Sequence, residues 1–208
     1  MKKLFNFALI AVVVLFCSCG GIGGGNLPTK VDYQMLSNDA ELEKVYGVVL
    51  EKLGDNIQFV DEVRLAIFRP SKEGSIIRTG KPDEFHLGIT HLYQADKKKL
   101  YQMSYTNESG WYSVGERKVE IFGSANVETF RLEDEMFDMS PLTTEILCKI
   151  VKDALAKYKD ETKYSYQYVK SIGIQYGRVE VTIYGRLSAN DLEKNNYYKA
   201  DLNGMPIR

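Results

Sequence analysis

The sequence predicts an α+β fold made of two tandem α-β-β-β units, in which each helix packs on an antiparallel sheet. Two segments repeat apolar residues with a helical period, and each is followed by segments in which apolar and polar residues alternate. The whole pattern recurs after about 100 residues, as a degenerate duplication would. A composition of 44% hydrophobic and 26% charged residues is typical of a globular protein.

The first helix is predicted over 39–53. Asn38 precedes it as a capping residue, with Glu41 three positions later, and Gly54 stands where a helix ends. Its apolar stripe consists of Leu42, Val45, Tyr46, Val49, Leu50 and Leu53.

The second helix is predicted to begin at Pro141, with Ser140 as its cap, and to extend to about Tyr158. Lysines gather near its end, where they complement the helix dipole. Its apolar face consists of Ile146, Leu147, Ile150, Val151, Ala154, Leu155 and Tyr158.

Alternating segments after each helix predict strands with one buried face. In the first unit they lie at 59–68, 85–93 and 101–106, and in the second at 168–176, 179–187 and 198–202, with a tight turn at Gly177. Lys118–Phe122 and Val127–Leu132 are predicted as one or two further strands before an acidic linker.

The N-terminus carries an export signal. Lys2 and Lys3 precede an apolar run, Leu4–Phe16, that is too short to cross a bilayer. The sequence Leu15-Phe16-Cys17-Ser18-Cys19 then resembles the lipobox of bacterial lipoproteins. The resemblance implies a signal peptide over residues 1–18 and fatty acyl chains of the palmitate type on Cys19. The residues after Cys19 carry no acidic cluster of the kind that resembles a surface-export tag in some lipoproteins, so the anchor is expected in the outer membrane facing the periplasm. A conventional signal cleavage, with both cysteines as apolar filler, is the alternative.

Glycine dominates residues 19–30, which are predicted to be a flexible tether. Residues 31–137 and 138–208 then form the two units. Removal of the leader with its two lysines leaves 25 basic against 28 acidic residues, a net charge of −3. This charge argues against nucleic acid as a partner.

The two sheets are expected to join edge to edge and to leave one broad concave face uncovered. This layout resembles the tandem α-β-β-β arrangement of PepSY-like and β-lactamase-inhibitor-like periplasmic proteins. The resemblance is topological and implies no function by itself.

Catalytic and metal-binding motifs are not evident. His86 and His91 are five residues apart on one strand and point to opposite faces, and His91 shares the apolar face. Cys148 lies beside the stripe of the second helix and is expected to be a buried apolar residue. The sequence therefore predicts no cofactor, no metal site and no enzymatic activity. A deep pocket around His86 or Glu133 would instead favour a small envelope hydrolase.

Tyrosine is unusually frequent, with 14 residues. Its rigid ring and polar tip suit recognition surfaces. Tyr164, Tyr166 and Tyr168 share one strand parity, whereas Tyr197 faces opposite to its buried neighbours. The candidate ligand-binding residues on the open sheet face are Trp111, Tyr164, Tyr166, Tyr184, Arg186 and Tyr197.

The predicted function is that of a lipid-anchored, exported, non-enzymatic binding protein of the bacterial cell envelope. Its partners would be the membrane, through Cys19, and an envelope protein or glycan. The alternatives are a structural or assembly lipoprotein without a ligand, and the hydrolase.

Overall fold

The computed structural model describes residues 27–69, 82–119 and 128–207. The predicted signal peptide, Cys19 and the tether up to residue 26 lie outside these residues, as does most of the predicted strand Lys118–Phe122. The helices and strands are α1 (Asp39–Leu53), β1 (Val60–Phe68), β2 (Glu84–Leu92), β3 (Lys99–Thr106), β4 (Gly110–Lys118), α2 (Thr144–Tyr158), β5 (Tyr164–Gln175), β6 (Arg178–Leu187) and β7 (Glu193–Asp201).

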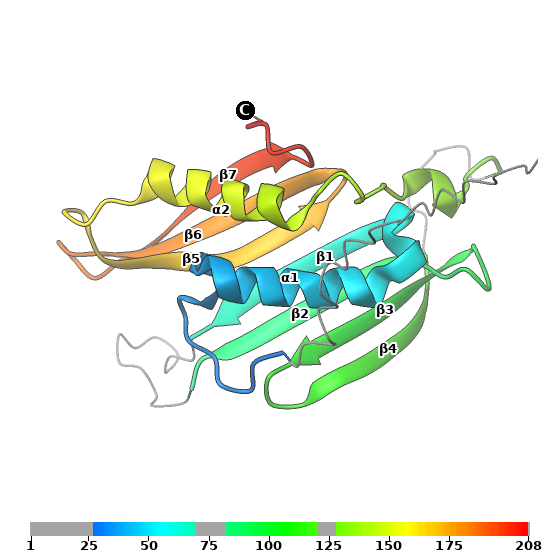
Figure 1. The fold of residues 1–208 in the computed structure, drawn as a ribbon, viewed down its shortest axis with the longest axis horizontal. Helices are drawn as coiled ribbons and strands as arrows, with labels where there is room; N and C mark the ends of the chain where they lie inside the picture. Colours follow the sequence, from blue (N-terminus) through cyan, green and yellow to red (C-terminus); the bar gives the residue numbers. More distant parts are fainter. Residues whose placement is uncertain (1–26, 70–81, 120–127, 208) are drawn as a thin grey trace, which may run out of the picture.

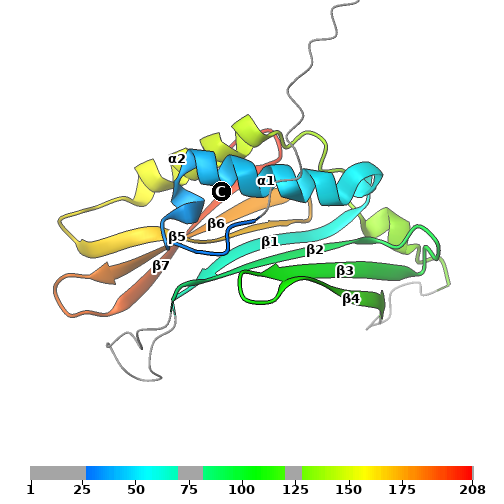
Figure 2. The ribbon, with the colours of Figure 1, turned by 60° about the horizontal axis from the view of Figure 1, so that its bottom comes forward.

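All seven strands form one antiparallel sheet in the order β4-β3-β2-β1-β5-β6-β7. Helix α1 contacts β2, and α2 contacts β6 and β7, so both helices lie on the same side of the sheet (Figure 1). Figure 2 shows the two helices above the sheet and neither of them below it. The α+β class is thus confirmed, and strands of both predicted units share one sheet. Among the described residues, the predicted first unit carries four strands and the predicted second unit three, so the expected equality of the two units is not confirmed.

Helix α1 begins and ends as predicted. The side chain of Asn38 accepts a hydrogen bond from the Glu41 amide at 3.2 Å, and Gly54 ends the helix with a positive φ of 48°.

The predicted start of α2 is wrong. Thr143, not Ser140, caps it by accepting a hydrogen bond from the Ile146 amide at 3.3 Å.

Packing of Leu142 explains this later start. Leu142 is fully buried, and its carbonyl accepts a hydrogen bond of 2.7 Å from the buried Tyr46 hydroxyl of α1. Burial raises the pKa of Tyr46, which keeps this hydroxyl protonated as the donor. The segment before Thr143 is therefore held against α1 in a turn, and the helix begins only after it.

Strands β1 and β5 join the two halves of the sheet. They pair only between Glu62–Ala66 and Ser171–Gln175. Beyond these residues β5 contacts the N-terminal segment instead of β1: the Ser37 hydroxyl accepts a hydrogen bond from the Val169 amide at 3.2 Å. The segment before α1 is thus part of the domain at the place where the central strands diverge.

A second, smaller apolar cluster lies at the far end of β2 and β3. It contains Leu92, Leu100 and Leu132, with Phe130 and Met136 packed against them. The prediction of a strand over Val127–Leu132 is wrong for its described part. Residues 128–131 form turns and coil that lead into a short 3₁₀ helix, Leu132–Glu135, because Leu132 packs on the sheet instead of pairing with it.

Candidate functional site

The sheet face opposite the helices, here called the open face, is polar. On the middle strand β1 it presents Glu62, Arg64 and Ala66, while Val63, Leu65 and Ile67 point to the helices and are fully buried. The alternation of the strand thus produces one apolar face and one face with hydrogen-bonding and charged side chains.

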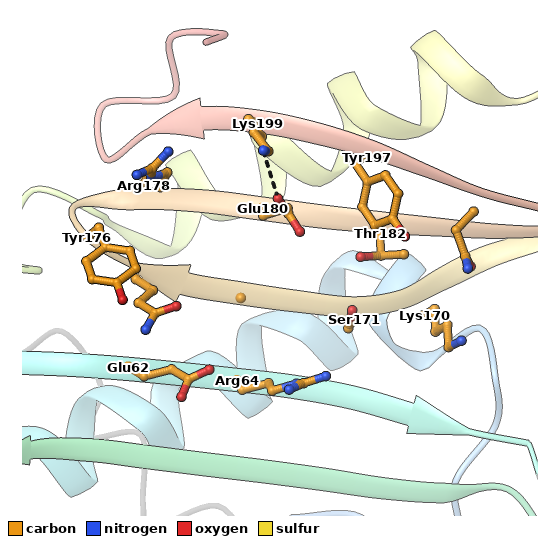
Figure 3. A pocket seen from close by; sticks show the side chains of 13 residues that line it. Glu62, Arg64, Lys170, Ser171, Tyr176, Arg178, Glu180, Thr182, Tyr197 and Lys199 are labelled. Atoms are coloured by element: carbon orange, nitrogen blue, oxygen red, sulfur yellow. Dashed lines mark ion pairs between the residues drawn. The ribbon is translucent and has the colours of Figure 1, made fainter. Parts of the chain in front are cut away.

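Two shallow depressions cover the open face and share Glu62 and Arg64. The larger, of about 530 Å³, extends over β1, β5, β6 and β7 (Figure 3), and the smaller, of about 350 Å³, extends over β1 to β4. The floor consists of small or hydrogen-bonding residues: Gly88, Thr90, Ser104, Ser171, Gly173 and Thr182.

Charges in the larger depression are unevenly paired. Lys199 forms an ion pair with Glu180 at 3.3 Å, as Figure 3 shows, and both come from the β6–β7 side. The side chain of Arg64 is exposed and makes neither an ion pair nor a hydrogen bond with the residues that the structure describes. The Lys170 ammonium forms no ion pair with the described residues and lies 5.6 Å from the centroid of the Tyr184 ring. Glu62 also lines the depression and has no ion pair with the described residues. With Arg64, Lys170, Arg178 and Lys199 against Glu62 and Glu180, the lining carries an excess of positive charge.

Tyrosines cluster where β1 and β5 diverge. Tyr166, Tyr168 and Tyr184 have ring centroids 5.1 to 6.4 Å apart. Tyr33, from the segment before α1, meets the ring of Tyr168 edge-on at 5.4 Å. These four residues, here called the tyrosine cluster, close one end of the open face.

Arg69 lies inside the tyrosine cluster. Its guanidinium carbon is 3.9 Å from the centroid of the Tyr33 ring and 5.2 Å from that of Tyr166. Its Nε is 3.3 Å from Oδ1 of Asp83, and the two side chains are only 12% and 7% exposed. Arg69 thus fixes the N-terminal segment to the sheet by stacking and by a nearly buried ion pair.

The environments of Tyr184 and Arg186 favour the protonated form of each side chain. Burial, together with hydrogen bonds to Glu193 and Tyr166, raises the pKa of Tyr184. Hydrogen bonds to Tyr166 and Tyr184 raise the pKa of Arg186, whose guanidinium also lies 3.5 Å from Glu193. These groups act as hydrogen-bonding residues, because a raised tyrosine pKa disfavours a phenolate nucleophile.

The structure brings together three of the predicted site residues, Tyr166, Tyr184 and Arg186, at the tyrosine cluster. Tyr197 also lies on the open face, where it is 54% exposed and lines the larger depression. Trp111 and Tyr164 lie on the helix side. Trp111 packs against the core beneath the Lys52 ammonium of α1, and the Tyr164 ring covers Gly185.

The shared parity predicted for Tyr164 and Tyr166 is wrong because of a β-bulge. Tyr164 pairs with Leu187 and Tyr166 pairs with Arg186. Adjacent residues of β6 thus pair with β5 residues that are two positions apart, and β5 carries one extra residue between them. The extra residue turns Tyr164 to the other face. A second bulge, between Val169 and Ser171, adds Lys170 to the open face.

The histidines, Cys148 and Glu133 do not converge. His86 lines the smaller depression and its Nε2 is 3.4 Å from Glu84, whereas His91 is buried. Glu133 pairs with Lys97 at 2.6 Å, beyond the other end of β2. Burial and the carboxylate of Asp39 raise the pKa of Cys148. Within residues 27–69, 82–119 and 128–207, no three His, Cys, Asp or Glu side chains gather as metal ligands.

The sequence interpretation did not identify Arg64, Gly88, Gly173, Tyr33 or Arg69. Glycine in the middle of an otherwise regular strand was the available signal at positions 88 and 173. The contact of Tyr33 with Arg69 depends on the tertiary fold, so no local sequence pattern predicts it.

No protein-family model, curated protein or solved structure matches the chain. The resemblances to bacterial lipoproteins and to PepSY-like proteins therefore stay predictions. None of the described helices is long and apolar enough to span a bilayer.

Proposed function

We propose that the chain is an exported binding protein of the bacterial cell envelope, anchored through lipid on Cys19 in the outer membrane and facing the periplasm, and that its open face binds a saccharide. The observation that carries this proposal is the broad sheet face that both helices leave uncovered, with exposed aromatic rings above a floor of small and polar residues. Its proposed role is binding without catalysis. The interpretation of the two halves as a duplicated unit belongs to the same proposal.

The aromatic residues favour a saccharide. Tyr197 on β7 and Tyr112 on β4 are 54% and 47% exposed and line the two depressions at opposite sides of the sheet. A tyrosine ring packs on the apolar face of a sugar while neighbouring side chains bind the sugar hydroxyls. Thr182, Ser171 and Ser104 supply such polar groups between the two rings.

A peptide partner fits the same face less well. Peptides commonly add a strand to a sheet edge or insert apolar side chains into pockets. At the β7 edge, the carbonyl of Tyr197 accepts a hydrogen bond from the Tyr158 hydroxyl at 2.8 Å, and that of Lys199 accepts one from the Ile207 amide at 2.9 Å. The β4 edge carries a bulge and ends in Glu116, Arg117 and Lys118, features that oppose strand addition.

We expect the double variant Tyr112→Ala/Tyr197→Ala to bind saccharides about tenfold more weakly, because each removed ring contributes a contact typical of binding hot spots. The measurement is binding of the full chain, purified in detergent, to an array of immobilised glycans and acidic peptides. Leu192→Ala/Met205→Ala is the matched control, since it removes two exposed apolar side chains that line neither depression. Unchanged binding by the tyrosine variant, or binding to peptides alone, would refute the proposal.

A further inference from the structure

Two strand glycines flank Arg64 on the open face. Arg64 on the middle strand is directly opposite Gly88 of β2 and Gly173 of β5. On the β2 side the row continues to Ser104 of β3. A strip of backbone without large side chains therefore crosses the centre of the sheet, with one arginine in its middle.

Neither backbone geometry nor packing requires glycine at these positions. Gly88 and Gly173 both have φ outside the positive range, and neither stands at a bulge. A Cβ atom added at either position would meet no atom within 4 Å. Glycine weakens a strand, and in strands it often marks a place where a ligand approaches the backbone closely. The open space above the two glycines is thus available to a ligand that lies flat on the strands.

The Arg64 guanidinium makes this space favourable for an anionic group of a ligand. Its neighbours at the same level have no side chains, and Figure 3 shows its guanidinium pointing away from Glu62 along β1. Across the strip, Glu180 is already paired with Lys199. A guanidinium with its planar donors free binds a carboxylate or phosphate through two parallel hydrogen bonds.

We infer that Gly88, Arg64 and Gly173 form an anion subsite that holds the carboxylate or phosphate of an acidic saccharide. This inference rests on the proposed function, to which it adds the ligand class and the residues that select it. Lys170, on the same face, supplies a second cation at the end of the larger depression. The sugar ring would lie on the glycine strip, and its acidic group would meet Arg64.

Two kinds of variant separate the subsite from the fold. Gly173→Val fills the strip, yet valine favours strands and its Cβ atom meets no neighbour within 4 Å, so the protein is expected to fold. Arg64→Gln removes the charge of an exposed side chain. Lys98→Gln is the matched charge control, because Lys98 is exposed in the β2–β3 turn, outside both depressions.

The experiment is titration calorimetry of the full chain in detergent with four probes: trigalacturonic acid, the same trisaccharide after carboxyl reduction, maltotriose phosphate and triglutamate. At least one acidic saccharide should bind about tenfold more tightly than the reduced trisaccharide, and Arg64→Gln and Gly173→Val should each remove about that factor, whereas Lys98→Gln should not. The two acidic probes distinguish a carboxylate from a phosphate as the preferred group.

Equal binding of the reduced and acidic trisaccharides, or acidic binding unchanged by both subsite variants, would overturn the anion subsite while the open face remained the saccharide surface. Binding of triglutamate alone, or of no probe, would overturn the proposed function itself.

Discussion

Replacement of Arg69 by Ala is expected to lower the free energy of unfolding by about 3 kcal/mol, because it removes a nearly buried guanidinium together with its ion pair to Asp83. The variant also removes the guanidinium that stacks on Tyr33 and Tyr166. Urea denaturation followed by circular dichroism measures the change.

The matched control is Arg64→Ala on β1, the strand that ends just before Arg69. Arg64 is exposed and unpaired among the described residues, so its loss should change the free energy of unfolding by less than about 0.5 kcal/mol. Similar effects of the two replacements would show that Arg69 does not fix the N-terminal segment to the sheet.

Replacement of Cys19 by Ala is expected to abolish both membrane association and incorporation of labelled palmitate. Several acyl chains on one residue anchor a protein stably, and without them the short apolar leader offers no lasting anchor. The measurement is fractionation of cells grown with labelled fatty acid. Cys17→Ala is the control, because bulky Phe16 precedes Cys17 and only Cys19 follows a small residue. Persistence of both membrane association and label in the Cys19 variant would contradict the anchor.

Local signals in the sequence were sufficient for most elements. The apolar stripe of α1, its Asn38 cap and Gly54 all lie within the segment that they define, and the structure has the helix at the predicted residues. The start of α2 was mispredicted because Ser140 and Pro141 satisfy the local pattern equally well. The contact that decides it, from the Tyr46 hydroxyl to the carbonyl of Leu142, joins residues 96 positions apart.

The candidate site was predictable only in part, for a related reason. Parity along a strand assigned Tyr184 and Tyr197 to the open face, where the structure has them, but the bulge at the start of β5 separates Tyr164 from Tyr166, with which it was expected to share a face. The subsite around Arg64 depends on register across three strands, since Gly88 and Gly173 become its neighbours only when β2 and β5 pair with β1. A single sequence does not specify that register.

Photocrosslinking in intact cells shows whether the open face is the binding surface. A diazirine amino acid would replace Thr182 or Gln102 on the open face in the full chain, and Lys44 or Lys157 on the exposed sides of the two helices. Crosslinked saccharide adducts are expected at Thr182 and Gln102 and not at the two helix positions. Adducts at Lys44 and Lys157 without any at Thr182 and Gln102 would contradict this expectation.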